Sequence, residues 1–484
     1  MIPLLLRLAT LADLPQVCET YRLVCDKMNA DGVTQWRWGE YPNEDMLRED
    51  IELKQLYVLD GAKEIAAVAC VNCQQDPEYD DVRWLFGTRP GSFHRLAIHP
   101  AHQGRSLFRY VLEDVENILR QKGCDCLRID TYVENEHARS VYARCGLRAA
   151  GMVKFFHRPL PFVCFEKPLT LDCPLLPLPM LPAYRGGFLT PWGGTKLRDM
   201  FGKNIVQPTG ESLEVSCIPE LESRDPAGVP LPALIQRYGE KLVGQYFDKP
   251  FPLLLKLLDA KDALSVQVHP DDAYAHANEY GKLGKTEAWL ILDAPEGSEL
   301  VYGIQPGTDL ATLRAACENG PAVEPLLRRV KVKPGDVCFI PAGCVHAIGA
   351  GIVLYEIQQS SDVTYRFYDW DRTDALGRKR PLHIDKALAV TDLTFCLDPV
   401  PAPDAPCVRV LDEKYFKLDL LRPQGEVAIP DAGDFGFLTA LECDMEIAWQ
   451  GGSMPLKKGQ TVLIPAAAPT LTLKGEGRAA LAMP

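Results

Sequence analysis

Hydrophobic and polar positions follow two different patterns along the chain. Before residue 168, helical spacing alternates with strand-like runs. Residues 12–30, which follow Thr10 as a candidate cap, and residues 103–122 carry apolar side chains on one helical face, whereas residues 63–71 and 126–133 are typical of buried strands. These elements predict a mixed α/β domain.

After residue 183 the pattern consists of many short strand-like runs separated by Gly and Pro turns. Helical patches interrupt them only at 231–246 and 308–318. Short strands with frequent turns are typical of a β-sandwich or barrel. A glycine followed six positions later by a proline occurs at Gly335–Pro341 and again at Gly459–Pro465, which suggests two related β units.

Prolines mark the boundaries between these parts. They are dense at 168–182, where they exclude a helix and interrupt any central strand, and again at 398–406. The predicted organisation is an α/β domain, a Pro-rich linker, a first β domain and a C-terminal β domain, at 1–168, 169–182, 183–397 and 407–484.

Charge and cysteine usage narrow the class of protein. The formal net charge is −13, which disfavours nucleic acid or an anionic membrane as a partner, although a locally basic pocket for a small phosphate stays possible. The 16 cysteines do not form a disulfide framework of the kind found in short secreted chains. We therefore expect a cytoplasmic protein with free thiols and no transmembrane helix.

The strongest candidate chemistry lies in the first β domain. Gln267 and His269 are two residues apart in a strand-like run, so they face the same side. Lys285 and Glu287 share a face in the same way, and His346 follows in Gly-x5-Pro-x-Gly-x2-His. Two imidazoles, a carboxylate and an amide oxygen make a plausible zinc shell that leaves room for substrate. Each of these residues on its own would more often be structural.

These motifs resemble the type I mannose-6-phosphate isomerases, a cupin family. The resemblance rests on four segments and covers about 183–395 strongly: QVHPDD, GKTEAW, PAGCVHAIG and DVTYRFYDWDR. It implies an all-β double jelly-roll fold, Zn²⁺ as cofactor and a sugar phosphate as substrate. It also implies zinc ligands Gln267, His269, Glu287 and His346, and active-site positions Arg366, Lys285 and Asp362. Cys344 stands where many relatives have threonine, and a thiolate ligand is conceivable there.

The chemistry of such a site suits aldose–ketose isomerisation. A divalent cation stabilises an enediolate without diverting it into redox chemistry. Arg366 and Lys285 are suited to hold the phosphate or the developing oxyanion. The group that moves the proton is not identified by the sequence: a metal-bound water, Asp362 or Lys285 would each serve.

The first domain resembles the GCN5-related N-acetyltransferases (GNAT). The resemblance rests on Arg7-x-Ala-Thr-x-x-Asp13, on the stretch RLAIHPAHQGRSLFRYVLEDVE and on NEHARSVYARCGL. It implies acetyl-CoA as a second cofactor, with its pyrophosphate held at a helix N-terminus. The positions that match are Gln103, Gly104, Arg105, Ser106 and Leu107. By the same resemblance, Asn135 contacts the cofactor and Tyr142 protonates the leaving thiolate.

The acetyltransferase motif departs from the usual pattern at Ser106 and Phe108, where small residues are expected. The domain would then either transfer acetyl groups to an unknown amine or serve as a docking module that binds CoA poorly. Candidate bases are Glu78, Asp81 and His94, each more simply read as a solvated side chain.

Two alternatives compete with a fused pair of enzymes. One is a sugar-phosphate sensor, in which a metal-binding cupin regulates the acetyltransferase-like half. The other is an iron oxygenase, which prefers two histidines and one carboxylate with open positions. Isomerase turnover is favoured over a sensor by the complete set of Gln267, His269, Glu287, His346, Lys285 and Arg366, since a sensor needs no proton-transfer groups. Gln267 and the long flanking matches speak against the oxygenase.

Overall fold

The computed structural model describes residues 5–104, 107–156, 158–169, 175–373 and 378–484. The chain divides into two compact units, residues 1–173 (unit 1) and residues 174–484 (unit 2). None of the described helices combines the length and the apolarity needed to cross a membrane.

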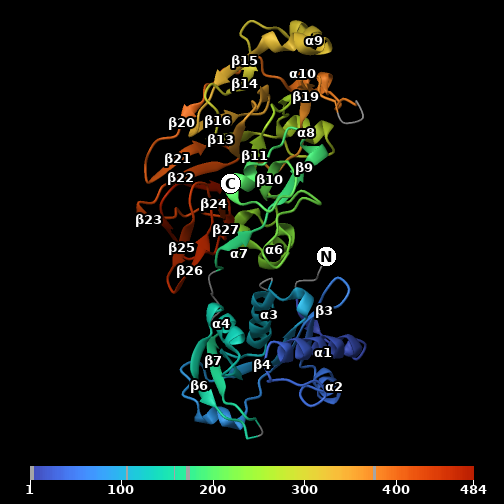
Figure 1. Ribbon diagram of the computed structural model, residues 1–484, viewed down its shortest axis with the longest axis vertical. Coiled ribbons are helices and arrows are strands. Elements are labelled where there is room, and N and C mark those ends of the chain that lie inside the picture. The colour runs from blue at the N-terminus through green and yellow to red at the C-terminus, as the bar shows by residue number, and fades with distance from the viewer. Residues whose placement is uncertain (1–4, 105–106, 157, 170–174, 374–377) are drawn as a thin grey trace. The chain divides into compact units, whose positions relative to one another are not determined.

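Unit 1 is built on one mixed sheet of seven strands in the order β1-β2-β3-β4-β5-β7-β6 (Figure 1). Neighbouring strands are antiparallel except β4 and β5, which are parallel. The strands are β1 Arg7–Leu8, β2 Leu56–Asp60, β3 Ile65–Asn72, β4 Pro90–Ile98, β5 Cys126–Tyr132, β6 Arg148–Val153 and β7 Phe162–Pro168. The predicted α/β class is therefore confirmed for this unit.

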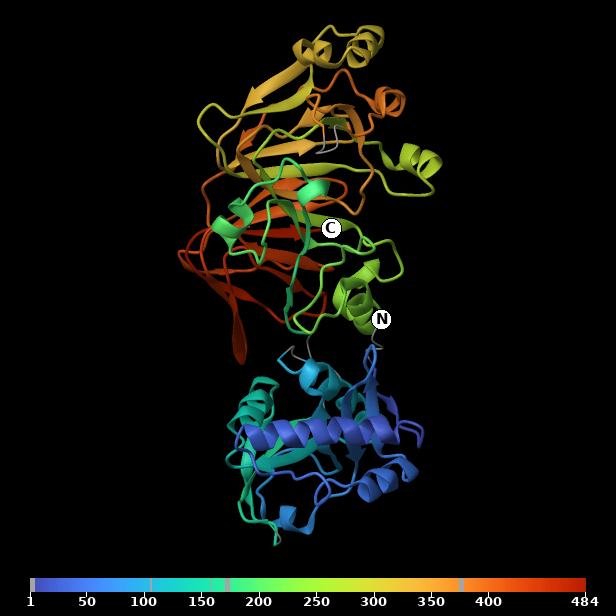
Figure 2. The same ribbon diagram turned by 45° about the vertical axis from the view of Figure 1, so that its right-hand side comes forward.

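Helices cover the sheet of unit 1. They are α1 Leu14–Ala30, α2 Glu44–Glu52, α3 Leu107–Gln121 and α4 Glu136–Arg144, and Figure 2 shows α1 lying across one face. All residues of β3 are buried, because both α1 and α3 pack against it. The proposed cap at Thr10 is wrong. Asp13 precedes α1, and the Thr10 hydroxyl donates to the Asp13 carboxylate, which also pairs with Arg7.

The first half of unit 2 contains two antiparallel sheets. One has seven strands in the order β20-β16-β13-β18-β11-β10-β9, and the other has five in the order β15-β14-β17-β12-β19. Their bounds are β9 Ala183–Gly186, β10 Thr209–Val215, β11 Leu253–Ala260, β12 Val266–Val268, β13 Glu287–Asp293, β14 Glu299–Ile304, β15 Leu327–Lys331, β16 Asp336–Ile340, β17 His346–Ala347, β18 Ile352–Gln359, β19 Tyr365–Tyr368 and β20 Val400–Pro401.

These two sheets face each other across an apolar core. Trp289 and Leu354 from the larger sheet pack with Leu300 and Tyr302 from the smaller one. Helices flank the sheets: α5 Lys196–Phe201, α6 Leu231–Tyr238, α7 Glu240–Val243, α8 Asp272–Asn278, α9 Leu310–Glu318 and α10 Ile384–Val390. In Figure 1, α9 and α10 lie near β14, β15 and β19.

The second half of unit 2 repeats this arrangement on a smaller scale. Its sheets have the orders β21-β22-β29-β24-β27-β8 and β23-β28-β25-β26. Leu438, Ile447, Val462 and Leu473 from both sheets form its core. The strands are β8 Leu178–Met180, β21 Cys407–Asp412, β22 Lys417–Leu421, β23 Gly425–Ala428, β24 Gly436–Ala440, β25 Met445–Trp449, β26 Gly452–Leu456, β27 Thr461–Ile464, β28 Thr472–Gly475 and β29 Ala479–Met483.

The two glycines singled out in the sequence occupy equivalent places. Gly335 lies just before β16 with φ +93°, and Gly459 lies just before β27 with φ +78°, a conformation that favours glycine. The Pro-rich segment at 169–182 is not only a connection, because β8 within it pairs with β27. β8 lies at the edge of its sheet, where Pro179 interrupts no ladder on its far side.

Candidate metal centre and candidate cofactor cavity

Three short strands bring the predicted metal ligands of unit 2 together. Gln267 in β12 lies directly opposite His346 in β17 on one side and Arg366 in β19 on the other. His269 immediately follows β12, and Glu287 opens β13 in the facing sheet. The core between the two sheets therefore presents imidazole and carboxylate groups to one point.

His269, Glu287 and His346 are all buried, and one ligand atom from each lies within 4.8 Å of the others. His269 Nδ1 is 2.9 Å from the Val363 carbonyl, and His346 Nδ1 is 3.0 Å from the Cys344 carbonyl. A carbonyl oxygen can only accept, so both Nδ1 atoms carry the proton and both Nε2 atoms are unprotonated acceptors. These Nε2 atoms lie 3.6 Å and 3.3 Å from the Glu287 oxygens.

The electrostatics of this cluster favour a cation. Burial lowers the pKa of His346 to about 3 and holds the pKa of His269 well below its usual range, with Lys285 lowering both further. Both imidazoles are thus neutral ligands. Burial raises the pKa of Glu287 to about 7, although Lys285 opposes the shift. Neither Glu287 oxygen accepts a well-aligned hydrogen bond from any described residue, although Lys285 Nζ lies 2.7 Å from Oε2.

Two further side chains contact the cluster. The amide nitrogen of Gln267 lies 3.2 Å from His346 Nε2. Lys285 Nζ lies 2.7 Å from Glu287 Oε2 and 3.1 Å from His269 Nε2. Cys344 takes no part, because it belongs to the apolar core, its Sγ donates to the Val345 carbonyl, and burial raises the pKa of its thiol well above the usual range. The structure therefore gives no support to a thiolate ligand.

A cavity of about 370 Å³ opens beside the cluster and is lined by Gln267 and Lys285. Several charged side chains in its wall were missed by sequence reasoning: Arg185, Glu211, Lys256, Glu356 and Arg380. Lys256 lies 2.9 Å from Glu356, its direct partner across β11 and β18. A signal was present, since a lysine or a glutamate within an otherwise apolar strand must find a partner when it is buried.

Arg366 and Asp362 also line this cavity but differ in their surroundings. The Nε of Arg366 is buried without a hydrogen-bond partner among the described residues. Burial lowers the pKa of Arg366, and Arg380 lowers it further. Asp362 is exposed and pairs with Lys282 at 2.8 Å, which holds the pKa of its carboxyl below the usual range. The cavity thus contains a cation suited to an anionic ligand and, at its exposed side, an already paired carboxylate.

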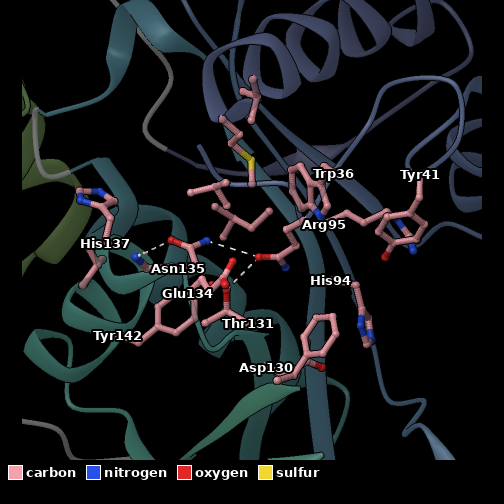
Figure 3. A pocket seen from close by; sticks show the side chains of 18 of the residues that line it. Trp36, Tyr41, His94, Arg95, Asp130, Thr131, Glu134, Asn135, His137 and Tyr142 are labelled. Carbon is pink, nitrogen blue, oxygen red and sulfur yellow. Dashed lines mark hydrogen bonds between the residues drawn. The ribbon is translucent and has the colours of Figure 1, made fainter. Parts of the chain in front are cut away.

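Unit 1 has its own cavity, of about 800 Å³, shown in Figure 3. It lies where β4 and β5 separate, because these strands pair only at Pro90–Cys126 and Gly91–Leu127 before β4 continues along β3 and β5 along β7. His94 of β4 and Asp130 of β5 line it on the two sides. A parallel pair that splays in this way leaves backbone and side chains open to a ligand.

The predicted cofactor residues fall into three groups. Gln103, Asn135 and Tyr142 line the cavity, whereas Leu107 is buried outside its wall and Gly104 does not line it. Arg105 and Ser106 lie outside the described residues.

Two of the lining side chains already have local partners. The Asn135 Oδ1 accepts from the Ala138 amide and caps α4, while its Nδ2 donates to the Gln35 Oε1 at 3.4 Å (Figure 3). The Gln103 side chain donates to the Ile98 carbonyl. Asn135 therefore has a structural role in addition to any contact with a cofactor.

Aromatic rings surround Tyr142. Phe108 lies 5.4 Å and Phe165 lies 5.5 Å from its ring, measured between centroids. Burial raises the pKa of Tyr142 above its usual range, so its hydroxyl stays protonated and able to donate. Of the candidate bases, Glu78 and His94 line the cavity and Asp81 is exposed outside it.

Comparison with known proteins identifies both units. Residues 190–293 match the model of the phosphomannose isomerase type I catalytic domain. The chain is 38% identical over 283 residues to mannose-6-phosphate isomerase ManA of Bacillus subtilis, covering 57% of this chain and 89% of the relative. It is 37% identical over 285 residues to the Streptococcus mutans mannose-6-phosphate isomerase, covering 57% and 88%. The chain belongs to the type I mannose-6-phosphate isomerase family.

Solved structures agree with this membership. The crystal structure of mannose 6-phosphate isomerase from Bacillus subtilis superposes with a TM-score of 0.58 at 34% identity, over 64% of this chain and all of that one. A mannose 6-phosphate isomerase bound with zinc and yttrium shares the fold at 18% identity, with a TM-score of 0.51. Unlike these relatives, this isomerase-family chain also carries residues 24–147, which match the acetyltransferase (GNAT) family.

Proposed function

We propose that unit 2 is a zinc-dependent isomerase that interconverts mannose 6-phosphate and fructose 6-phosphate through an enediolate. The observation that carries the proposal is the buried cluster in which the Glu287 carboxylate faces two neutral imidazoles. The names of the relatives point to the same substrate pair.

The residues present fit a zinc ion. His269 and His346 would offer Nε2, Glu287 a carboxylate oxygen and Gln267 its amide oxygen, after the amide turns over to exchange its O and N. When bound, zinc supplies Lewis-acid stabilisation of the negative charge that develops on the sugar oxygens. Lys285 would then shift toward the cavity that it already lines, because its two present partners become ligands.

Arg366 is our candidate for the anionic end of the substrate. Its Nε is buried without a partner and it lines the same cavity as Gln267. A guanidinium binds phosphate or an oxyanion through two parallel hydrogen bonds. Arg380 adds positive charge nearby, while its own guanidinium is held by Asp369 at 2.6 Å.

Lys285 is our candidate for moving the proton between C2 and C1. It is buried beside the metal cluster, whereas Asp362 is exposed and paired with Lys282. In this mechanism the substrate carbon gives its proton on one face of the enediolate and receives it back at the adjacent carbon. Asp362 would instead orient the open end of the sugar.

The deciding experiment is a coupled assay of the whole chain with mannose 6-phosphate. Turnover that disappears after chelation and returns with zinc would support the isomerase. A folded, metal-loaded protein that binds the sugar phosphate without turning it over would replace the isomerase by the sensor.

We further propose the domain limits 1–168, 183–397 and 407–484, with each half of unit 2 forming one jelly-roll of the cupin type. Support comes from the pairs of facing antiparallel sheets in each half. The C-terminal half carries no histidine, so its role would be structural.

For unit 1 we propose acetyl-CoA-dependent transfer of an acetyl group to an amine. The support is the family match together with a cavity between the splayed β4 and β5 that Tyr142, a protonated donor, lines. Titration calorimetry of the whole chain with acetyl-CoA tests the first requirement. Binding in the micromolar range would support transfer, and no binding would leave a docking module.

A further inference from the structure

The unit 1 cavity contains a carboxylate for which the acetyltransferase resemblance provides no role. Asp130 projects from β5 into the cavity (Figure 3). Its Oδ2 accepts a hydrogen bond of 2.5 Å from the Tyr79 hydroxyl. Its Oδ1 accepts none from the described residues. Tyr79 itself is buried in an aromatic cluster, so the carboxylate is held in one orientation.

Further carboxylates line the same cavity. Asp76 and Glu78 line it with Asp130, and the Asp76 charge is close enough to Asp130 to oppose its ionisation. Of the cations in the wall, Arg95 is paired with Asp50 at 2.6 Å. Arg158 stacks on the Tyr41 ring at 4.3 Å. Burial and Arg95 lower the pKa of His94 to about 4, so this imidazole is neutral.

The local charge is therefore negative. With Arg95 already paired, these three carboxylates share the cavity wall with the guanidinium of Arg158, whose charge lowers the pKa of Asp130. A ligand cation would relieve the repulsion among these carboxylates. The apolar part of such a ligand would meet rings that line the same cavity, at Tyr41, Phe155 and Phe162.

We propose that the acetyl acceptor is a small aliphatic diamine, and that Asp130 binds and deprotonates the ammonium that reacts. This inference rests on the acetyltransferase function proposed for unit 1. The opposite choice, an amino sugar phosphate that would link the two units metabolically, would bring negative charge against Asp76, Glu78 and Asp130.

The step balances with acetyl-CoA as the second reactant. The acceptor ammonium gives one proton to the Asp130 carboxylate, and the freed nitrogen lone pair attacks the thioester carbonyl. A C–N bond forms, the C–S bond breaks, and the thiolate takes a proton from Tyr142. The attacking nitrogen loses its second proton as it becomes the amide, and this proton restores the Tyr142 hydroxyl. The products are the N-acetyl amine and CoA, and the proton held by Asp130 is released to solvent.

The test uses the whole chain and follows loss of thioester absorbance, because thiol reagents would also react with the protein's own cysteines. We expect kcat/KM for 1,4-diaminobutane to exceed that for glucosamine 6-phosphate at least tenfold, with n-butylamine in between. Asp130→Asn should lower kcat about 100-fold, the range of a general base, and leave the acetyl-CoA Kd within twofold. Asp80→Asn, an exposed carboxylate on the same short helix as Tyr79, is the matched control and should change neither.

Each of the other possible outcomes contradicts a specific part of this proposal. Preference for the amino sugar phosphate overturns the acceptor class, and Asp130→Asn with more than a third of the wild-type kcat overturns the base. Acetyl-CoA that binds while none of the three amines is acetylated overturns the inference but keeps the cofactor site. Acetyl-CoA that does not bind overturns the acetyltransferase itself, and the inference falls with it.

Discussion

Gln267 and His346 are direct partners across β12 and β17, and the Gln267 amide lies 3.2 Å from His346 Nε2. This cross-strand pair brings together the segment that contains Gln267 and His269 and the Gly-x5-Pro-x-Gly-x2-His motif that ends at His346. Since His346 Nδ1 is held by the Cys344 carbonyl, Nε2 is the atom directed at Gln267. An amide that can present either nitrogen or oxygen at this point suits a centre that binds and releases a cation.

Replacing Gln267 by alanine should weaken zinc binding by about tenfold or more, because one oxygen donor is removed while His269, Glu287 and His346 remain. Competition with a chromogenic chelator measures the affinity. Gln207→Ala, an exposed glutamine in the same unit, is the control and should bind zinc as the wild type does. Equal affinities in the two variants would remove Gln267 from the ligand set.

Arg366→Lys should reduce kcat/KM for mannose 6-phosphate by about 10- to 100-fold, the loss expected when charge-assisted hydrogen bonds worth about 1.5–3 kcal/mol are disturbed. Lysine keeps the charge but not the planar pair of donors, so inorganic phosphate should also inhibit the variant less strongly. Arg314→Lys, an exposed arginine paired with Asp385, serves as the control. An unchanged KM and an unchanged phosphate inhibition constant would exclude Arg366 from phosphate binding.

Much of this site could be predicted from sequence because its chemistry is local. Period-two spacing puts Gln267 and His269 on one face, and Gly343, with φ +89°, shapes the turn between β16 and β17 that leads to His346. The other charged residues in the wall of the cavity cannot be predicted from local sequence patterns. Lys256 and Glu356 are about 100 positions apart, and their pairing follows from the register of β11 and β18, which sequence spacing does not contain.

In unit 1, too, sequence patterns predict the elements but not the partners of individual side chains. The strand spacing predicts β5, yet the proposed role of Asp130 depends on Tyr79, which lies in a short helix that precedes β4 in the sequence. The sequence motif predicts that Asn135 contacts the cofactor, and the structure shows that it also caps α4. A side chain's partners are decided by tertiary packing, so a residue type at a motif position leaves its role open.

Lys256→Met should lower the free energy of unfolding of unit 2 by about 3–5 kcal/mol, because it leaves the buried Glu356 carboxylate without its 2.9 Å partner. The double variant Lys256→Met with Glu356→Gln should recover part of the loss, since no charge then stays unpaired. Urea unfolding followed by tryptophan fluorescence measures both. Lys261→Met, an exposed lysine just after β11, is the control. A double variant as unstable as the single one would mean that lost packing, not the orphaned charge, causes the effect.

Acetyl transfer should rise with pH through about 6 and then level off. Burial raises the pKa of Asp130 to about 6, Asp76 adding to the shift and the Tyr79 hydrogen bond opposing it, and a general base acts only when deprotonated. The charged and titratable groups that face Asp130 are Asp76, Tyr79, Tyr142, Arg158 and Cys164.

Tyr79→Phe removes a hydrogen bond that favours the ionised carboxylate, so the rise in kcat/KM should move to higher pH. A merely structural role for Tyr79 would lower the rate without moving the pH profile.

The pH dependence of stability is an independent measure of the Asp130 pKa. A carboxyl whose folded pKa is raised makes the protein less stable as pH rises from its unfolded value, near 4, through 6. Asp130→Asn should therefore raise the melting temperature of unit 1 at pH 7.5 and not at pH 4, and an equal change at both pH values would contradict a raised pKa for Asp130.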